Sequence, residues 1–348
     1  MKMVALVYDR NAGEADIVGF DSSGRVSLDH TNEGWRTTWG LDVVGSFIGN
    51  GNEQALLYDR ENGEADIVGF NDRGEVALDT TNSGWRKSWE LAVAGEFIGN
   101  GRSQALLYDR AAGEADIVGF SGNGQVELDT INRGWRKTWD SMTVGSFVSS
   151  NCSQVLLYDR SAGEADIVGF NQKGEVKLDT TNRGWRKTWD LVVVGEFLGS
   201  GCSQALLYDR SAGEADIVGF NEKGEVKLDA INRGWRKTWE WAVVGDFLGN
   251  GRSQVLLYDR SAGEADIVGF NDKGEVCLDT INRGWRKTWD LVAVGAFVCN
   301  GRSQVLLYAR SAGEADIVGF NDKGEVCLDM INKGWRKTWN LMSALRIC

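Results

Sequence analysis

The chain has 348 residues, a formal net charge of −12, 45 glycines and no proline. The acidic balance argues against a nucleic-acid-binding protein, which needs a basic surface. Because 15 tryptophans, 7 tyrosines and 13 phenylalanines accompany the glycines, the composition is not that of a disordered chain either.

No apolar run approaches the length of a membrane-spanning helix, so we expect no membrane insertion. The first ten residues, MKMVALVYDR, carry charge too early for a signal peptide. We therefore expect a soluble protein, either cytoplasmic or released without a classical signal.

A period of 50 residues governs the whole sequence. The segment GEADIVGF begins at Gly13 and returns every 50 residues through Gly313. YDR begins at Tyr8 and recurs through Tyr258, whereas the seventh copy reads YAR from Tyr308. No linker or change of composition interrupts the repeats, so residues 1–348 are predicted to form one domain of seven units.

Each unit predicts four short strands separated by glycine-rich turns. In the last complete unit these strands are expected at 289–297, 304–310, 315–320 and 325–332. The first two are almost continuously apolar, as strands covered on both faces are. The fourth alternates apolar with charged or variable residues, which suits an exposed edge. The first strand is therefore expected nearest the axis and the fourth at the rim.

The two ends of the chain predict a closed ring. The N-terminus begins with a second strand, and residues 341–348 supply a first strand that has no successor. Pairing the two completes the seventh sheet and removes its open edges. We predict an all-β, seven-bladed β-propeller with four antiparallel strands per blade, closed by the C-terminal strand.

Alternate turns of such a sheet lie at the same end, which brings the GWRKTW link and the DRSAGE turn to one face. The first tryptophan of the link, which follows a glycine, and the arginine after it are the predicted ligand-binding residues. They are Trp35, Trp85, Trp135, Trp185, Trp235, Trp285 and Trp335, with Arg36, Arg86, Arg136, Arg186, Arg236, Arg286 and Arg336. Flat aromatic faces beside guanidinium and carboxylate groups suit a sugar.

Structural roles compete with ligand binding for these residues. The second tryptophan of each link, Trp39 and its six equivalents, leads directly into a strand and is expected to pack between blades. The arginine could stack on an indole or pair with the aspartate of YDR. The carboxylates Glu64 and Asp66 lie on one strand face, but their repetition in every blade argues against one catalytic site.

Metals, cofactors and disulfides are not indicated. The chain has one histidine and six scattered cysteines without a CxxC pair, which suits reduced thiols and argues against a structural zinc site. Cys277 and Cys327 occupy a variable position and are expected to be exposed. We predict no cofactor and no metal ligands.

The motifs Gly-Trp-Arg, Thr-Trp, Val-Gly-x-Phe and Leu-Leu-Tyr-Asp-Arg together resemble the repeat of seven-bladed propeller lectins of the Psathyrella velutina and Photorhabdus type. The resemblance covers essentially the whole chain. It implies up to seven sites for fucose or N-acetylglucosamine type sugars between adjacent blades. The GEFLGNGRSQ loop also resembles an FG-GAP calcium loop, but it lacks the acidic ligands that calcium needs.

These observations predict a multivalent carbohydrate-binding lectin, with glycans as partners and oligomers possible. The alternative is a structural or protein-interaction scaffold built by amplification or design, with no sugar binding. In both cases we expect a protein that is not an enzyme.

Overall fold

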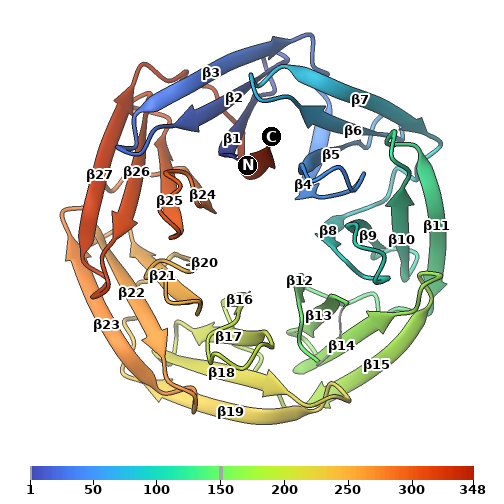
Figure 1. Ribbon diagram of the computed structural model, residues 1–348. Helices are drawn as coiled ribbons and strands as arrows, with labels where there is room; N and C mark the ends of the chain where they lie inside the picture. Colours follow the sequence, from blue (N-terminus) through green and yellow to red (C-terminus); the bar gives the residue numbers. More distant parts are fainter. Residues whose placement is uncertain (1, 149–151) are drawn as a thin grey trace.

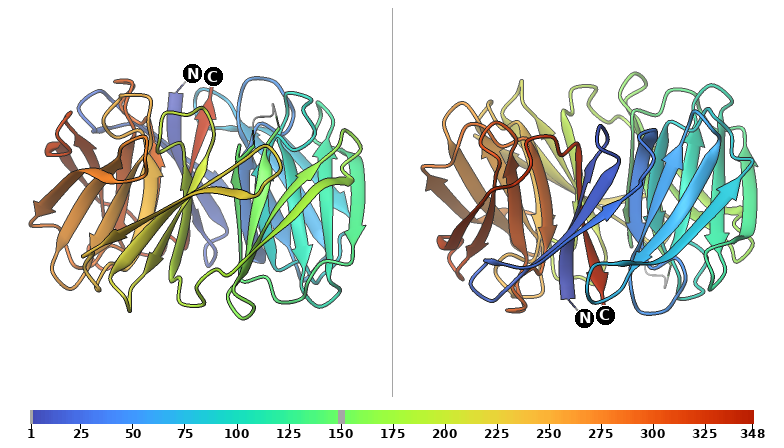
Figure 2. Two further views of the ribbon diagram at one scale, coloured as in Figure 1. Left: turned by 90° about the horizontal axis from the view of Figure 1, so that it is seen from below. Right: turned by 90° about the horizontal axis from the view of Figure 1, so that it is seen from above.

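The computed structural model describes residues 2–148 and 152–348 of the chain. In these ranges 28 strands form seven four-stranded antiparallel sheets. The sheets stand around a central axis like the blades of a propeller (Figure 1) and make a thick disc in side view (Figure 2). The described ranges contain no α-helix, and so no helical segment able to cross a membrane.

Each blade contributes one strand to each of four concentric positions. The innermost strands are β28 (Leu341–Ile347), β4 (Trp39–Gly45), β8 (Leu91–Gly95), β12 (Ser141–Gly145), β16 (Leu191–Gly195), β20 (Trp241–Gly245) and β24 (Leu291–Gly295). The second strands are β1 (Lys2–Asp9), β5 (Gln54–Asp59), β9 (Gln104–Asp109), β13 (Gln154–Asp159), β17 (Gln204–Asp209), β21 (Gln254–Asp259) and β25 (Gln304–Ala309).

The third and fourth strands complete the sheets. The third strands are β2 (Glu14–Phe20), β6 (Glu64–Phe70), β10 (Glu114–Phe120), β14 (Glu164–Phe170), β18 (Glu214–Phe220), β22 (Glu264–Phe270) and β26 (Glu314–Phe320). The outermost are β3 (Val26–Glu33), β7 (Val76–Ser83), β11 (Val126–Arg133), β15 (Val176–Arg183), β19 (Val226–Arg233), β23 (Val276–Arg283) and β27 (Val326–Lys333). Blade 1 is β28-β1-β2-β3, blade 2 is β4–β7, and so on to blade 7, β24–β27.

The ring is closed as predicted by the two ends of the chain. Strand β28 pairs antiparallel with β1, from Lys2 opposite Ile347 to Tyr8 opposite Leu341. The termini consequently lie side by side at one end of the disc (Figure 2). The pairing covers the inner edge of β1, which would otherwise present unpaired backbone groups.

The core lies between blades. One buried cluster joins Phe47 and Tyr58 of blade 2 to Leu107 and Phe120 of blade 3, with Trp89 from the link between the two blades. Trp89 is 2% exposed, and the ring of Phe47 meets the ring of Phe120 edge-on at 5.5 Å. The predicted packing role of the second tryptophan is confirmed. Both faces of the middle strands are covered in this way, which is why their sequence is nearly all apolar.

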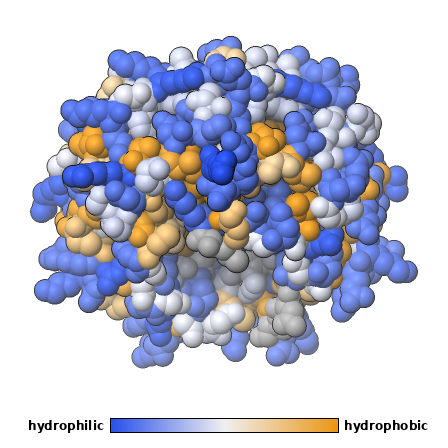
Figure 3. Space-filling view, turned by 45° about the horizontal axis from the view of Figure 1, so that its top comes forward, coloured by the Kyte–Doolittle hydropathy of each residue, from blue (hydrophilic) through white to orange (hydrophobic). Residues whose placement is uncertain are grey.

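Strand order agrees with the prediction, and the strand ends differ in a systematic way. The predicted strand at 289–297 is observed as Leu291–Gly295, because Trp289 and Phe297 leave the ladder to pack against neighbouring blades. The outer strands alternate as expected, and Cys277 and Cys327 are exposed. Apolar residues show on one face as separate patches among hydrophilic ones (Figure 3).

Candidate active site

The GWRKTW link of one blade lies against the next blade. In the first link the backbone N–H of Trp35 donates to the carbonyl of Gly13 at 2.8 Å, within blade 1. The Arg36 guanidinium then reaches blade 2, where it binds Glu64 and lies 3.5 Å from Asp59. The link and the DR turn therefore share one face, as the strand count predicted.

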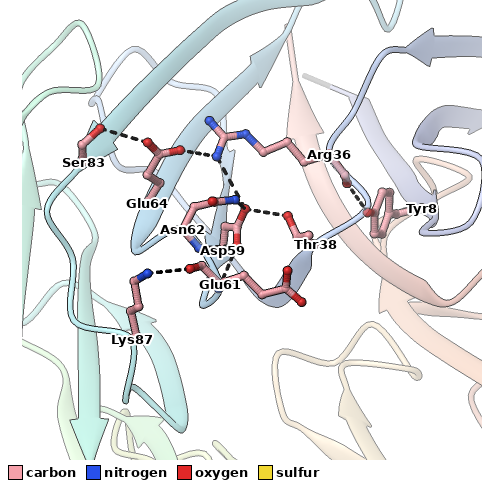
Figure 4. A network of polar contacts seen from close by, with 9 residues as sticks. All are labelled: Tyr8, Arg36, Thr38, Asp59, Glu61, Asn62, Glu64, Ser83 and Lys87. Carbon is pink, nitrogen blue, oxygen red and sulfur yellow. Dashed lines mark hydrogen bonds and ion pairs between the residues drawn. The ribbon is translucent and has the colours of Figure 1, made fainter.

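Asp59 is the centre of a polar network that joins the two blades (Figure 4). Its carboxylate accepts hydrogen bonds from the Thr38 hydroxyl at 2.5 Å and the Asn62 side chain at 2.7 Å. The backbone N–H of Glu61 donates to it at 2.9 Å. Burial opposes ionisation of Asp59, but these hydrogen bonds outweigh it and hold its pKa below the ordinary value.

The arginine of each link also stacks on the second tryptophan of the same link. Arg36 lies 5.3 Å from the centroid of Trp39, and the other six pairs lie between 5.1 and 5.5 Å. Both structural alternatives considered for this arginine are therefore observed: it stacks on an indole in all seven links, and in five of them it also pairs with the YDR aspartate of the following blade. A guanidinium that contacts an indole on one side and carboxylates on the other is held in one position.

The fourteen predicted ligand-binding residues are distributed one pair to each junction between blades. Each first tryptophan is half-buried, with its ring about 6 Å from the tyrosine of its own blade, as in the 6.0 Å pair of Trp35 and Tyr8. The pairs Trp35 and Arg36, Trp85 and Arg86, and Trp285 and Arg286 line well-formed clefts. Contact of these fourteen residues with a ligand stays a prediction.

We name each cleft by the aspartate on its floor. The Asp66 cleft has a volume of about 370 Å³, the Asp116 cleft about 240 Å³ and the Asp316 cleft about 290 Å³. Their walls come from the link, and their floors come from the third and fourth strands of the following blade. These volumes suit a ligand the size of one sugar ring.

The floor aspartate holds an unsatisfied oxygen in every blade. Within the described residues, no group donates a hydrogen bond to Oδ1 of the buried residues Asp16, Asp66, Asp116, Asp166, Asp216, Asp266 and Asp316. Buried polar atoms without a partner are rare and costly, and they are common at functional sites. A second aspartate is close by, because the register places Asp316 opposite Ile331 and Val318 opposite Asp329.

The residue opposite the floor aspartate on the fourth strand is threonine in some blades and isoleucine in others, so the seven clefts have two kinds of floor. In blades 1, 2 and 4 a threonine hydroxyl donates to the floor aspartate, as Thr81 does to Asp66. Burial still raises the pKa of Asp66, and the threonine bond opposes that rise. In blades 3, 5, 6 and 7 the threonine is replaced by Ile131, Ile231, Ile281 or Ile331.

Without the threonine the floor carboxyl is held less firmly in its charged form. Burial, followed by the neighbouring carboxyl of Asp329, raises the pKa of Asp316 to about 7. Burial and the charge of Asp229 raise the pKa of Asp216 to about 6. These carboxyls therefore exchange protons near neutral pH, the property that a general acid or base needs.

The Asp316 cleft differs from the others because of the seventh YAR. Ala309 stands where blade 2 has Asp59, so Arg286 lacks a second carboxylate and Thr288 lacks the acceptor that Thr38 has. Arg286 keeps its ion pair with Glu314. Trp289 also lines this cleft, and no described residue accepts a hydrogen bond from its buried Nε1–H. An unsatisfied donor and an unsatisfied acceptor thus occur in one cleft, as they also do in the Asp66 cleft with Trp39, so the feature peculiar to the Asp316 cleft is Ala309.

Asp316 belongs to the Asp66 series, whose repetition in every blade argued against catalysis, and Asp329, Ile331 and Ala309 were not predicted as site residues. The visible signals were the exchange of threonine for isoleucine among the repeats and the single departure from YDR. Among the described residues, no group of three or more histidine, cysteine, aspartate or glutamate side chains is placed to hold a metal ion.

The fold is similar to solved propellers of several bacteria. No protein-family model and no curated protein sequence matches the chain. A candidate 6-phosphogluconolactonase of Bacteroides fragilis aligns with a TM-score of 0.64 and 10% identity over 99% of this chain and 98% of its own. The periplasmic gluconolactonase of Pseudomonas aeruginosa gives 0.64 and 10% over 100% and 99%. A Lactobacillus plantarum protein gives 0.65 and 8% over 99% of both chains.

At these identities the likeness shows the fold alone. The names of these structures contradict two expectations, that the chain is a lectin or a scaffold and that it is not an enzyme. Two of the three similar structures carry lactonase names and none of the three is named a lectin. The similarity of the repeat to propeller lectins is confirmed for the seven-bladed architecture and not for the lectin type.

Proposed function

We propose that the protein hydrolyses a small sugar lactone in the Asp316 cleft. The observation that carries the proposal is that Ala309 leaves Arg286 without a second carboxylate in a cleft that also has a buried carboxyl oxygen and a buried indole N–H, neither with a hydrogen-bond partner among the described residues. The lactonase names of the similar propellers support the choice of substrate class.

The residues of the cleft match the needs of ester hydrolysis. Ionised Asp316 accepts a proton from a water molecule while the water oxygen bonds to the lactone carbonyl carbon. Negative charge then develops on the carbonyl oxygen, where the Nε1–H of Trp289 and the guanidinium of Arg286 are the available donors. The bond from that carbon to the ring oxygen breaks, and the ring oxygen leaves as a hydroxyl with the proton held by Asp316. One water is consumed and one hydroxy acid is formed.

The repetition of the same residues in every blade argues against a single catalytic site. Blade 7 breaks this repetition. The other six blades have an aspartate at the position of Ala309, which binds the link threonine (Ser88 before blade 3) and, in most blades, pairs with the link arginine as well. Only in the Asp316 cleft is that carboxylate replaced by a methyl group, which leaves Arg286 a free donor capacity for substrate. Burial and the carboxyl of Asp329 also keep the pKa of its aspartate high, with Ile331 in place of the threonine whose hydroxyl opposes that rise in other blades.

Restoring the aspartate tests the proposal. We expect the new carboxylate in Ala309→Asp to bind Arg286 and Thr288, as Asp59 binds Arg36 and Thr38. Arg286 is then less available to the substrate, and kcat/KM for D-glucono-1,5-lactone should fall by about tenfold. The same change should raise the free energy of unfolding by ~1–3 kcal/mol, because it supplies charge-assisted hydrogen bonds. A pH-stat measures acid release above the uncatalysed rate, and urea unfolding measures stability.

The matched control is Ala212→Asp in blade 5. This change adds a carboxylate to the corresponding turn, but the link arginine that faces blade 5 already has its aspartate partner. If the wild-type protein releases no acid above background, or if Ala309→Asp raises stability and leaves kcat/KM unchanged, the proposed site is wrong.

A further inference from the structure

The opposite face carries two further cavities, both at places where an arginine is missing. Arg102, Arg252 and Arg302 occupy equivalent positions before the second strands of blades 3, 6 and 7, and Cys152 and Cys202 replace them in blades 4 and 5. A cavity of about 760 Å³ lies beside Cys152, and one of about 850 Å³ lies beside Cys202. The two thiols are partly exposed.

The sister blades show what this position binds. Nη1 of Arg302 donates to the carbonyl of Phe320 at 2.9 Å, and Nη2 donates to Asp322 at 2.5 Å. Nη1 of Arg102 donates to the equivalent carbonyl of Phe120 at 3.1 Å. A guanidinium thus fits between the end of a third strand and the turn that follows it, and its planar fork matches this acceptor pair.

Blade 5 retains the acceptors and lacks the arginine. The carbonyl of Phe220 corresponds to that of Phe320, and Glu222 corresponds to Asp322. Both residues line the cavity beside Cys202. Phe220 is half-buried, whereas its six equivalents in the other blades are buried, including Phe170 of blade 4.

The charge of the cavity also favours a cation. Carboxylates of Glu222, Glu225 and Asp272 line it, against the ammonium groups of Lys223 and Lys227. The cavity beside Cys152 has Gln172 in place of Glu222 and the lysines Lys173 and Lys177. It keeps the shape of the site and loses the carboxylate that would pair with a guanidinium.

We propose that the cavity beside Cys202 is a binding site for a small alkylguanidinium ligand, which occupies the place taken by the arginine side chain in blades 3 and 7. The ligand donates to the Phe220 carbonyl and to Glu222, and its alkyl chain lies over Cys202. The site is on the face opposite the Asp316 cleft and is independent of the lactonase proposal.

Protection of the thiols tests this site. Propylguanidinium at about 10 mM should slow the reaction of Cys202 with iodoacetamide several-fold, measured for each cysteine by peptide mass spectrometry. The exposed Cys277 and Cys327 are internal controls that should react at an unchanged rate. Butylammonium has the same charge without the planar fork and should protect Cys202 less.

Two variants separate the site from a general effect of the cation. Glu222→Gln should abolish the protection of Cys202, and Gln172→Glu should create protection at Cys152. The proposal is overturned if propylguanidinium slows Cys202 no more than Cys277, or if Glu222→Gln is protected as well as the wild-type protein.

Discussion

Replacing Asp316 with asparagine should lower kcat/KM for sugar-lactone hydrolysis by about 10²–10⁴. Asparagine has the shape of aspartate but cannot accept a proton from the attacking water. The loss should appear mainly in kcat, because binding of the lactone depends on the walls of the cleft rather than on this proton transfer.

The protein provides its own control in blade 4. Asp166 is the equivalent floor residue, with the same unpartnered oxygen, but Thr181 donates to it and its link arginine, Arg136, has Asp159 and Glu164 as partners. Asp166→Asn should leave lactone hydrolysis unchanged. Equal losses in both variants would mean that activity depends on the stability of the ring and not on one cleft.

Removal of the Asp59 side chain should have the largest effect on stability, a loss of ~3–5 kcal/mol for Asp59→Ala in urea or thermal unfolding. The carboxylate is buried and receives hydrogen bonds from Thr38, Asn62 and a turn amide. Without it, Arg36 and these donors lose their shared acceptor at the junction of blades 1 and 2.

Asp72→Ala is the matched control, since Asp72 is exposed in a turn of the same blade. Its stability should stay within about 0.5 kcal/mol of the wild-type value. A loss for Asp59→Ala that is no larger than that for Asp72→Ala would contradict the role of the Asp59 network in joining blades 1 and 2. The junction of blades 6 and 7 lacks the equivalent carboxylate, because blade 7 has Ala309 in place of the aspartate.

The fold was predictable from sequence because its determinants are local and repeated. GEADIVGF, the turn glycines and the unmatched first strand at 341–348 specify blade number, strand order and closure without any long-range information. The packing of Trp89 between blades followed from its place at the start of a strand. The strand ends were less predictable, because Trp289 and Phe297 leave the ladder for contacts with other blades.

The candidate site was only half predictable. The link residues Trp285 and Arg286 could be placed on one face by counting strands. The importance of Asp316 depends on the register of β26 with β27, which brings Asp329 diagonally beside it. The meaning of Ala309 depends on its being opposite an arginine from the preceding link. Neither pairing is encoded in the spacing of one repeat.

The pH dependence of kcat/KM for D-glucono-1,5-lactone tests the central claim most directly. Asp316 acts in its ionised form, so kcat/KM should rise with pH through an apparent pKa of about 7. Ile331→Thr should introduce the hydroxyl found in blades 1, 2 and 4, stabilise the ionised form and move that rise to lower pH. A profile that is the same in the wild-type protein and in Ile331→Thr, or no hydrolysis above background at any pH, would contradict the assignment of Asp316 as the base.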